Sequence, residues 1–200
     1  MRRAAIWLGL LCALIVPLVL AAGSPLLAWR QPIYIAAGFA GILALQMMVL
    51  QPLLAAGLLP GVPLDLGRRV HLWVGSTLVA AIVIHVAALW VTSPPDVVDA
   101  LLLVSPTPFS DWGVMAMWAV FGAALLALLR RALRLGPVAW RVGHTCLVTL
   151  AVLGSVLHAM LVDGTMETLS KFALCVLAVA ANAVAVSRRR AWSMLRRRRM

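Results

Sequence analysis

Six long apolar stretches take up most of this chain and decide what it can fold into. A helix needs about 20 apolar residues to cross the hydrocarbon core of a bilayer, and each stretch is close to that length. Backbone in lipid must satisfy its own hydrogen bonds, which runs of this kind achieve as helices. We therefore expect one all-α integral membrane domain over residues 1–200, a six-transmembrane-helix bundle with helices at 4–22, 33–50, 70–91, 112–129, 142–162 and 168–186 and an Arg-rich tail at 187–200.

The composition supports a membrane location and gives the charge a simple meaning. Hydrophobic residues make up 64% of the chain and charged residues 12%, whereas soluble domains are nearer half apolar. The net charge of +11 lies between the apolar stretches, so we expect a lipid bilayer and no nucleic acid as partner. Fifteen of the 17 Lys and Arg fall on one side of the expected bundle, with Arg30 and Lys171 on the other. The positive-inside rule then predicts that both termini are cytoplasmic.

Two segments allow more than one interpretation. The first stretch begins Met1-Arg2-Arg3 and imitates a secretory signal, so the sequence leaves open whether it is cleaved. The connection 92–111 contains four prolines around the apolar run 97–104, which could form a short helix on the outer surface.

All four histidines fall in the third and fifth apolar stretches, and this distribution is the main functional signal. His71 and His85 are 14 residues apart, and so are His144 and His158. Fourteen helical residues advance about 21 Å and end about 40° short of four full turns, so each pair shares one helix face. Both helices run in the same direction across the membrane. If they face each other, His71 opposes His144 and His85 opposes His158.

Two stacked pairs of imidazoles suit the iron of haem, because two axial imidazoles leave no open position and favour electron transfer. A single histidine in a membrane helix often only hydrogen-bonds a neighbour, but four at matched depths favour haem between helices 3 and 5. Histidines four turns apart do not converge on one metal ion. The alternative that we keep is a membrane transporter or assembly factor that uses the paired histidines for protons or partner contacts.

The stretches GRRVHLWVGSTLVAAIVIHVAALW (67–90) and WRVGHTCLVTLAVLGSVLHAMLV (140–162) resemble the ferric reductase-like transmembrane domain family. The resemblance lies in the doubled histidine spacing, the basic pair before the first histidine and the Trp-x3-His start of the fifth helix. That family includes ferric reductases, the membrane part of NADPH oxidases and a bacterial haem-binding subunit of the methionine sulfoxide reductase system. In size and layout this chain is similar to the last, a stand-alone component.

The resemblance implies haem b, two groups or at least one, bound by His71, His85, His144 and His158. It also implies a bacterial inner membrane, a cytoplasmic flavin reductase or similar donor, and an outer acceptor that is a periplasmic protein, a quinone or a ferric chelate. We expect FMN or FAD to act only through such a partner. Whether the chain is an oxidoreductase by itself stays open.

Three arginines lie close to the cytoplasmic histidines, namely Arg68, Arg69 and Arg141. They are candidates to pair with haem propionates, which guanidinium groups bind well, although the positive-inside rule alone also explains them. Trp140, near the same interface, we interpret as a belt residue.

Small and amide residues near the histidines have two interpretations each. Gly75, Gly143 and Gly154 would let a flat macrocycle approach the backbone, or serve helix packing. Gln46 and Gln51 would contact a quinone, or form an interhelical hydrogen bond or helix end.

Overall fold

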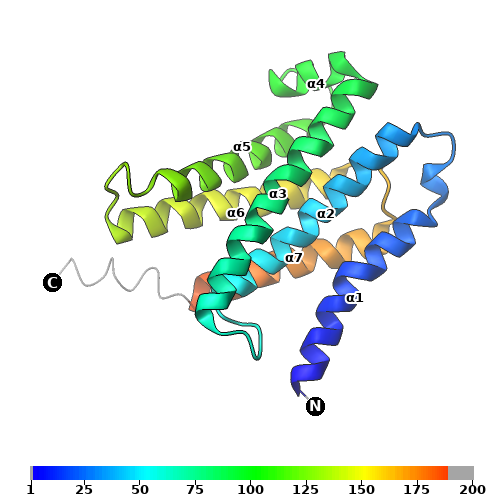
Figure 1. The fold of residues 1–200 in the computed structure, drawn as a ribbon. Helices are drawn as coiled ribbons and strands as arrows, with labels where there is room; N and C mark the ends of the chain where they lie inside the picture. Colours follow the sequence, from blue (N-terminus) through cyan, green and yellow to red (C-terminus); the bar gives the residue numbers. More distant parts are fainter. Residues whose placement is uncertain (1, 189–200) are drawn as a thin grey trace.

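The computed structural model describes residues 2–188 and consists of six long helices with two short ones between them (Figure 1). The long helices are α1 (Arg2–Ala22), α2 (Pro32–Ala55), α3 (Leu64–Thr92), α5 (Pro108–Leu129), α6 (Pro137–Leu161) and α7 (Thr168–Arg188), and the short ones are the 3-10 turn η1 (Pro25–Leu27) and α4 (Pro94–Leu101). Each long helix is long and apolar enough to cross a bilayer, and the described part of the chain contains no strand. The expected all-α membrane bundle is therefore confirmed.

The helices extend beyond the apolar stretches that mark them in the sequence. α3 begins at Leu64 and includes Arg68 and Arg69, because a helix continues through polar residues once it has left the lipid. α5 and α6 each begin at a proline, which fits the first helical turn where no backbone N–H is needed. Of the expected Arg-rich tail 187–200, residues 187 and 188 belong to α7, and the remainder lies outside the described residues.

The helices pack as two antiparallel pairs joined by α7. α2 lies along α3 and α5 lies along α6, while α7 contacts both α2 and α6 (Figure 1). α5 and α6 approach closely because Gly154 faces Ala116 and the carbonyl of Trp112; a Cβ at residue 154 would be 3.0 Å from that oxygen. Small residues allow such contact between membrane helices, where there is no hydrophobic force to bring them together.

A buried amide of α2 forms a hydrogen bond to α1. Gln46 is 1% exposed, and its Nε2 donates to the carbonyl oxygen of Leu14 at 2.7 Å. Pro17 lies one turn further along α1 and cannot donate a backbone hydrogen bond, so the ladder is weakened in this region. Of the two interpretations of Gln46, the structure favours the interhelical hydrogen bond.

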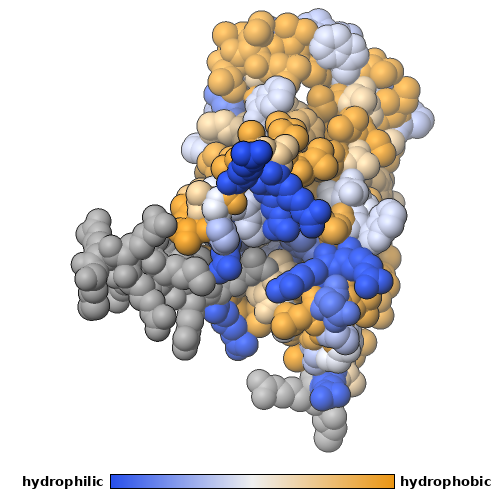
Figure 2. Space-filling view, turned by 60° about the vertical axis from the view of Figure 1, so that its left-hand side comes forward, coloured by the Kyte–Doolittle hydropathy of each residue, from blue (hydrophilic) through white to orange (hydrophobic). Residues whose placement is uncertain are grey.

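The two ends of the bundle differ in charge. We call one the arginine end; its described arginines are Arg3, Arg68, Arg69, Arg130, Arg131, Arg134, Arg141 and Arg188. Figure 2 shows strongly hydrophilic residues grouped over the middle and lower part of the face in view, with mostly apolar residues above them. At the opposite end, Lys171 is 5% exposed and its Nζ donates to the carbonyl oxygen of Val162 at 2.9 Å. This bond satisfies a carbonyl just after the last residue of α6 and places a positive charge near the negative end of that helix.

Candidate functional site

The structure brings His85 of α3 and His158 of α6 into direct contact. These are the third and fifth membrane-spanning helices, because α4 is too short to span. Their ring centres are 6.3 Å apart and the ring planes are 84° from parallel. Both side chains are half-buried at the end of the bundle opposite the arginines. Two helices that pack mainly on other neighbours therefore meet through their histidines.

Each of these rings is fixed by a backbone carbonyl of the neighbouring helix in its pair. His85 Nδ1 donates to Ala37 of α2 at 2.7 Å, and His158 Nδ1 donates to Phe109 of α5 at 2.8 Å. A carbonyl oxygen only accepts, so the proton must lie on Nδ1 in both rings. Nε2 then keeps its lone pair, which is the state that a metal-binding histidine needs.

A glycine makes room for each of these hydrogen bonds. Gly41 and Gly113 lie one helical turn after the carbonyl that accepts the bond, on the same side of the helix. A Cβ at residue 41 would be 3.2 Å from His85 Nδ1, and a Cβ at residue 113 would be 2.7 Å from His158 Nδ1. We call each combination of carbonyl, glycine and histidine a histidine notch. Neither glycine stands out in the sequence as part of a site.

The spacing of the two rings fits a shared metal. Bonds of about 2.0 Å between a metal and imidazole nitrogens, with the size of the rings, separate the centres of two opposed ligands by about 6 Å. The observed 6.3 Å agrees with that value. Together with the Nδ1 hydrogen bonds, this makes the donor set suitable for the axial ligands of one haem iron.

An apolar layer lies midway between the two expected histidine pairs. Leu78 is seven residues from each histidine of α3, and Ala151 is seven from each histidine of α6. Both share the histidine face by helical geometry, and both are buried in the same core cluster, at 7% and 4% exposed. The two levels are thus about 21 Å apart along the helices, separated by packed hydrocarbon.

The second pair lies toward the arginine end, in a different environment. His71 Nδ1 donates to the carbonyl of Gln51 at 3.2 Å. His144 stacks on Trp140, with ring centres 5.5 Å apart and planes within 14° of parallel, and the Arg130 guanidinium carbon is 5.0 Å from the centre of the same indole. Ligation by His71 and His144 stays a prediction.

Two polar atoms in this region are buried without a hydrogen-bond partner among the described residues. They are the indole Nε1 of Trp140 and the Oε1 of Gln51. Buried donors and acceptors are nearly always paired in folded proteins, so an unpaired one indicates an absent ligand or water. The sequence predicts Trp140 as an interface belt residue and does not reveal its stacking on His144.

The other residues singled out in the sequence lie around the histidines in ways that the spacing did not show. Arg68, Arg69 and Arg141 are exposed at the arginine end. A Cβ at Gly75 would be 2.8 Å from Gln51 Nε2, and one at Gly143 would be 3.3 Å from Leu126. These contacts, like that of Gly154, favour packing between helices as the role of the glycines.

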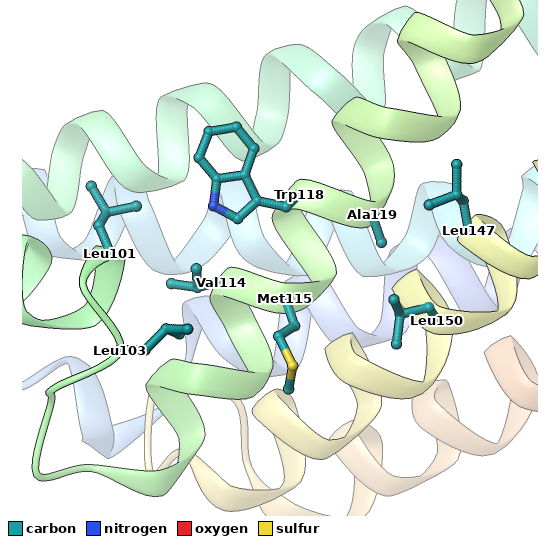
Figure 3. Close-up of a pocket in the computed structure, with 8 residues that line it drawn as sticks. All are labelled: Leu101, Leu103, Val114, Met115, Trp118, Ala119, Leu147 and Leu150. Atoms are coloured by element: carbon teal, nitrogen blue, oxygen red, sulfur yellow. The ribbon is translucent and has the colours of Figure 1, made fainter.

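One surface groove lies apart from the histidine site. It is a groove of about 350 Å³ between the segment that follows α4 and the helices α5 and α6 (Figure 3). Its lining is apolar: Leu101, Leu103, Val114, Met115, Trp118, Ala119, Leu147 and Leu150. No group of three or more His, Cys, Asp or Glu side chains within residues 2–188 is placed to hold a metal ion without a cofactor.

Comparison with known proteins agrees with the resemblance in the sequence. The family model described as ferric reductase like transmembrane component matches residues 37–155. The match begins at Ala37, which accepts the hydrogen bond of His85, and includes His71, His85 and His144; His158 follows it by three residues. No curated protein and no solved structure gives a significant match.

Proposed function

Since the chain belongs to the family of ferric reductase-like transmembrane components, whose members generally bind haem, we propose that it carries electrons across the membrane through b-type haem. His85 and His158 are the axial ligands of one haem. His71 and His144 are the ligands of a second, about 21 Å away along the helices. When bound between two imidazoles, haem supplies one-electron transfer with no open position on the iron.

The contact between His85 and His158 is the observation that carries this proposal. Both rings present Nε2 as the free nitrogen because both Nδ1 atoms donate to carbonyls, and the ring spacing fits a shared iron. Each imidazole is held by a helix other than its own, so its orientation is set before a ligand binds. Such support from a second layer of residues is typical of metal ligands.

The charge distribution supports a direction for the electrons. The resemblance to the bacterial haem-binding subunit favours a bacterial inner membrane. The arginine end is cytoplasmic by the positive-inside rule, so both termini lie in the cytoplasm and the His85–His158 level lies toward the periplasm. A cytoplasmic flavin reductase, or a similar flavin or nicotinamide protein, donates electrons at the arginine end. The acceptor at the other end is a periplasmic protein, a quinone or a ferric chelate. Arg68, Arg69 and Arg141 pair with propionates of the haem at the arginine end.

The test is a reduced-minus-oxidised spectrum of the detergent-purified protein, with haem extracted and counted per chain. Wild type is compared with His85→Ala and His71→Ala. Two haems in wild type, with about one lost in each variant, would support the full relay. A protein expressed with ample haem that contains none would reject the proposal and favour a transporter or assembly factor.

A further inference from the structure

The indole N–H of Trp140 is a buried donor with no acceptor among the described residues. It belongs to a side chain that stacks on the proposed haem ligand His144, one helical turn closer to the arginine end. The unpaired atom is therefore buried close to the proposed ligand His144. A ligand acceptor that reaches this point would satisfy it.

The surroundings of Trp140 favour a negatively charged acceptor. Trp140 lies in the first turn of α6, which begins at Pro137, and helix N-termini attract anions through free backbone amides and the helix dipole. The Arg130 guanidinium, 5.0 Å from the indole centre, adds a positive charge. Asp163 lies two residues beyond the far end of α6, and the described acidic residue at the arginine end is Asp65, in the first turn of α3, against eight described arginines there. Positive charge therefore predominates at this end.

We propose that Trp140 Nε1, supported by Arg130 and the N-terminus of α6, donates a hydrogen bond to a carboxylate of the haem held by His71 and His144. This inference rests on the proposed function, because it needs a haem at that level. The role that it assigns to Trp140 differs from the role of the exposed arginines. The arginines attract the carboxylates at the surface, whereas the indole fixes one of them inside the protein.

Trp140→Phe is the test, because phenylalanine keeps an aromatic ring beside His144 and removes the N–H. We expect the midpoint potential of the haem at the arginine end to fall, since an uncompensated carboxylate stabilises the ferric form. The propionate bending band of that haem should shift in the resonance Raman spectrum, and its affinity should fall by about tenfold or more. Trp118→Phe is the matched control, because Trp118 is 59% exposed on α5 and should change none of these quantities.

The outcomes separate this inference from the proposed function. Wild type without haem would reject both. Wild type with haem only at the His85–His158 level would leave the relay incomplete and reject the Trp140 assignment. Two haems whose potentials and propionate bands are the same in wild type and Trp140→Phe would reject the Trp140 assignment alone.

Discussion

The histidine notch at Gly113 allows a specific prediction: an added methyl group at residue 113 should weaken binding of the proposed haem at the His85–His158 level. In Gly113→Ala, the new Cβ would be 2.7 Å from His158 Nδ1, closer than real Cβ atoms approach such an atom. The ring must therefore move away and lose or lengthen its 2.8 Å hydrogen bond to Phe109. Overpacking of this kind costs about 1–3 kcal/mol, and loss of a hydrogen bond that orients a metal ligand lowers metal affinity about 10–100-fold.

Two other glycines provide a graded series. Gly41→Ala would place its Cβ 3.2 Å from His85 Nδ1, so a small movement of the ring relieves the contact and the loss should be smaller. Gly122→Ala, on α5 like Gly113, would place its Cβ 3.6 Å from Leu147, which is ordinary contact. Gly122→Ala should bind haem as wild type does. It therefore controls for the effect of an added methyl group on α5.

The assay is haem content per chain together with a haem titration of the stripped protein, and thermal unfolding in detergent checks that each variant is folded. The affinity for haem at the His85–His158 level should be highest in wild type and Gly122→Ala, lower in Gly41→Ala and lowest in Gly113→Ala. The potential of the second haem should not change. A folded Gly113→Ala protein that binds both haems with wild-type affinity and spectrum would refute the argument that the glycine positions His158.

Three further predictions follow from contacts at the same end of the bundle. The ring planes of His85 and His158 are 84° apart, so the ferric haem between them should give the strongly anisotropic low-spin EPR signal of crossed imidazoles; a signal typical of parallel imidazoles would contradict this geometry. Lys171→Met should destabilise the protein to denaturant by about 1–3 kcal/mol, because it leaves the carbonyl at the end of α6 without its charged donor, whereas the exposed Arg30→Met should have a smaller effect. The backbone amides of Ser170 and Leu169 donate to the Glu167 carboxylate, and hydrogen bonding by Ser170, followed by Leu169, lowers the pKa of that carboxyl from its ordinary value of 4.5. Its stabilising effect is therefore complete above pH 4.5 and is lost as the pH falls through the lower folded pKa. Thermal unfolding against pH should therefore show a smaller loss below pH 4.5 in Glu167→Gln than in wild type, and equal losses would reject the role of these bonds.

The sequence was sufficient to predict the helices because the signals that specify them are local. Length and hydropathy are enough to identify a spanning helix, and the 14-residue spacing puts both histidines of a helix on one face whatever surrounds it. The ends were less accurate because hydropathy marks where lipid ends rather than where the helix ends. Pro108 and Pro137 mark the starts of α5 and α6 better than the first apolar residue does.

The surroundings of the histidines could not be predicted because they come from distant parts of the chain. The carbonyl that fixes His85 is 48 residues away, and the one that fixes His158 is 49 residues away. Gly41 and Gly113 resemble any other glycine of an apolar helix until the neighbouring helix is in place. A local clue does exist for Trp140, which is one turn from His144, but a tryptophan near a membrane interface has a more common explanation.

The arrangement of the helices explains how a site between α3 and α6 can be ordered without close packing of those two helices. His85 is fixed by α2, the partner of α3 in the first antiparallel pair, and His158 is fixed by α5, the partner of α6 in the second. Each pair therefore orients its own imidazole, and α7 contacts both pairs, so we expect it to help hold them at their distance. A flat cofactor between the pairs would need little rearrangement of either ligand, which lowers the cost of binding. Substitutions in the contact of α7 with α2 or α6 should then weaken haem binding through the spacing of the two halves, while substitutions in a notch should act on one histidine alone.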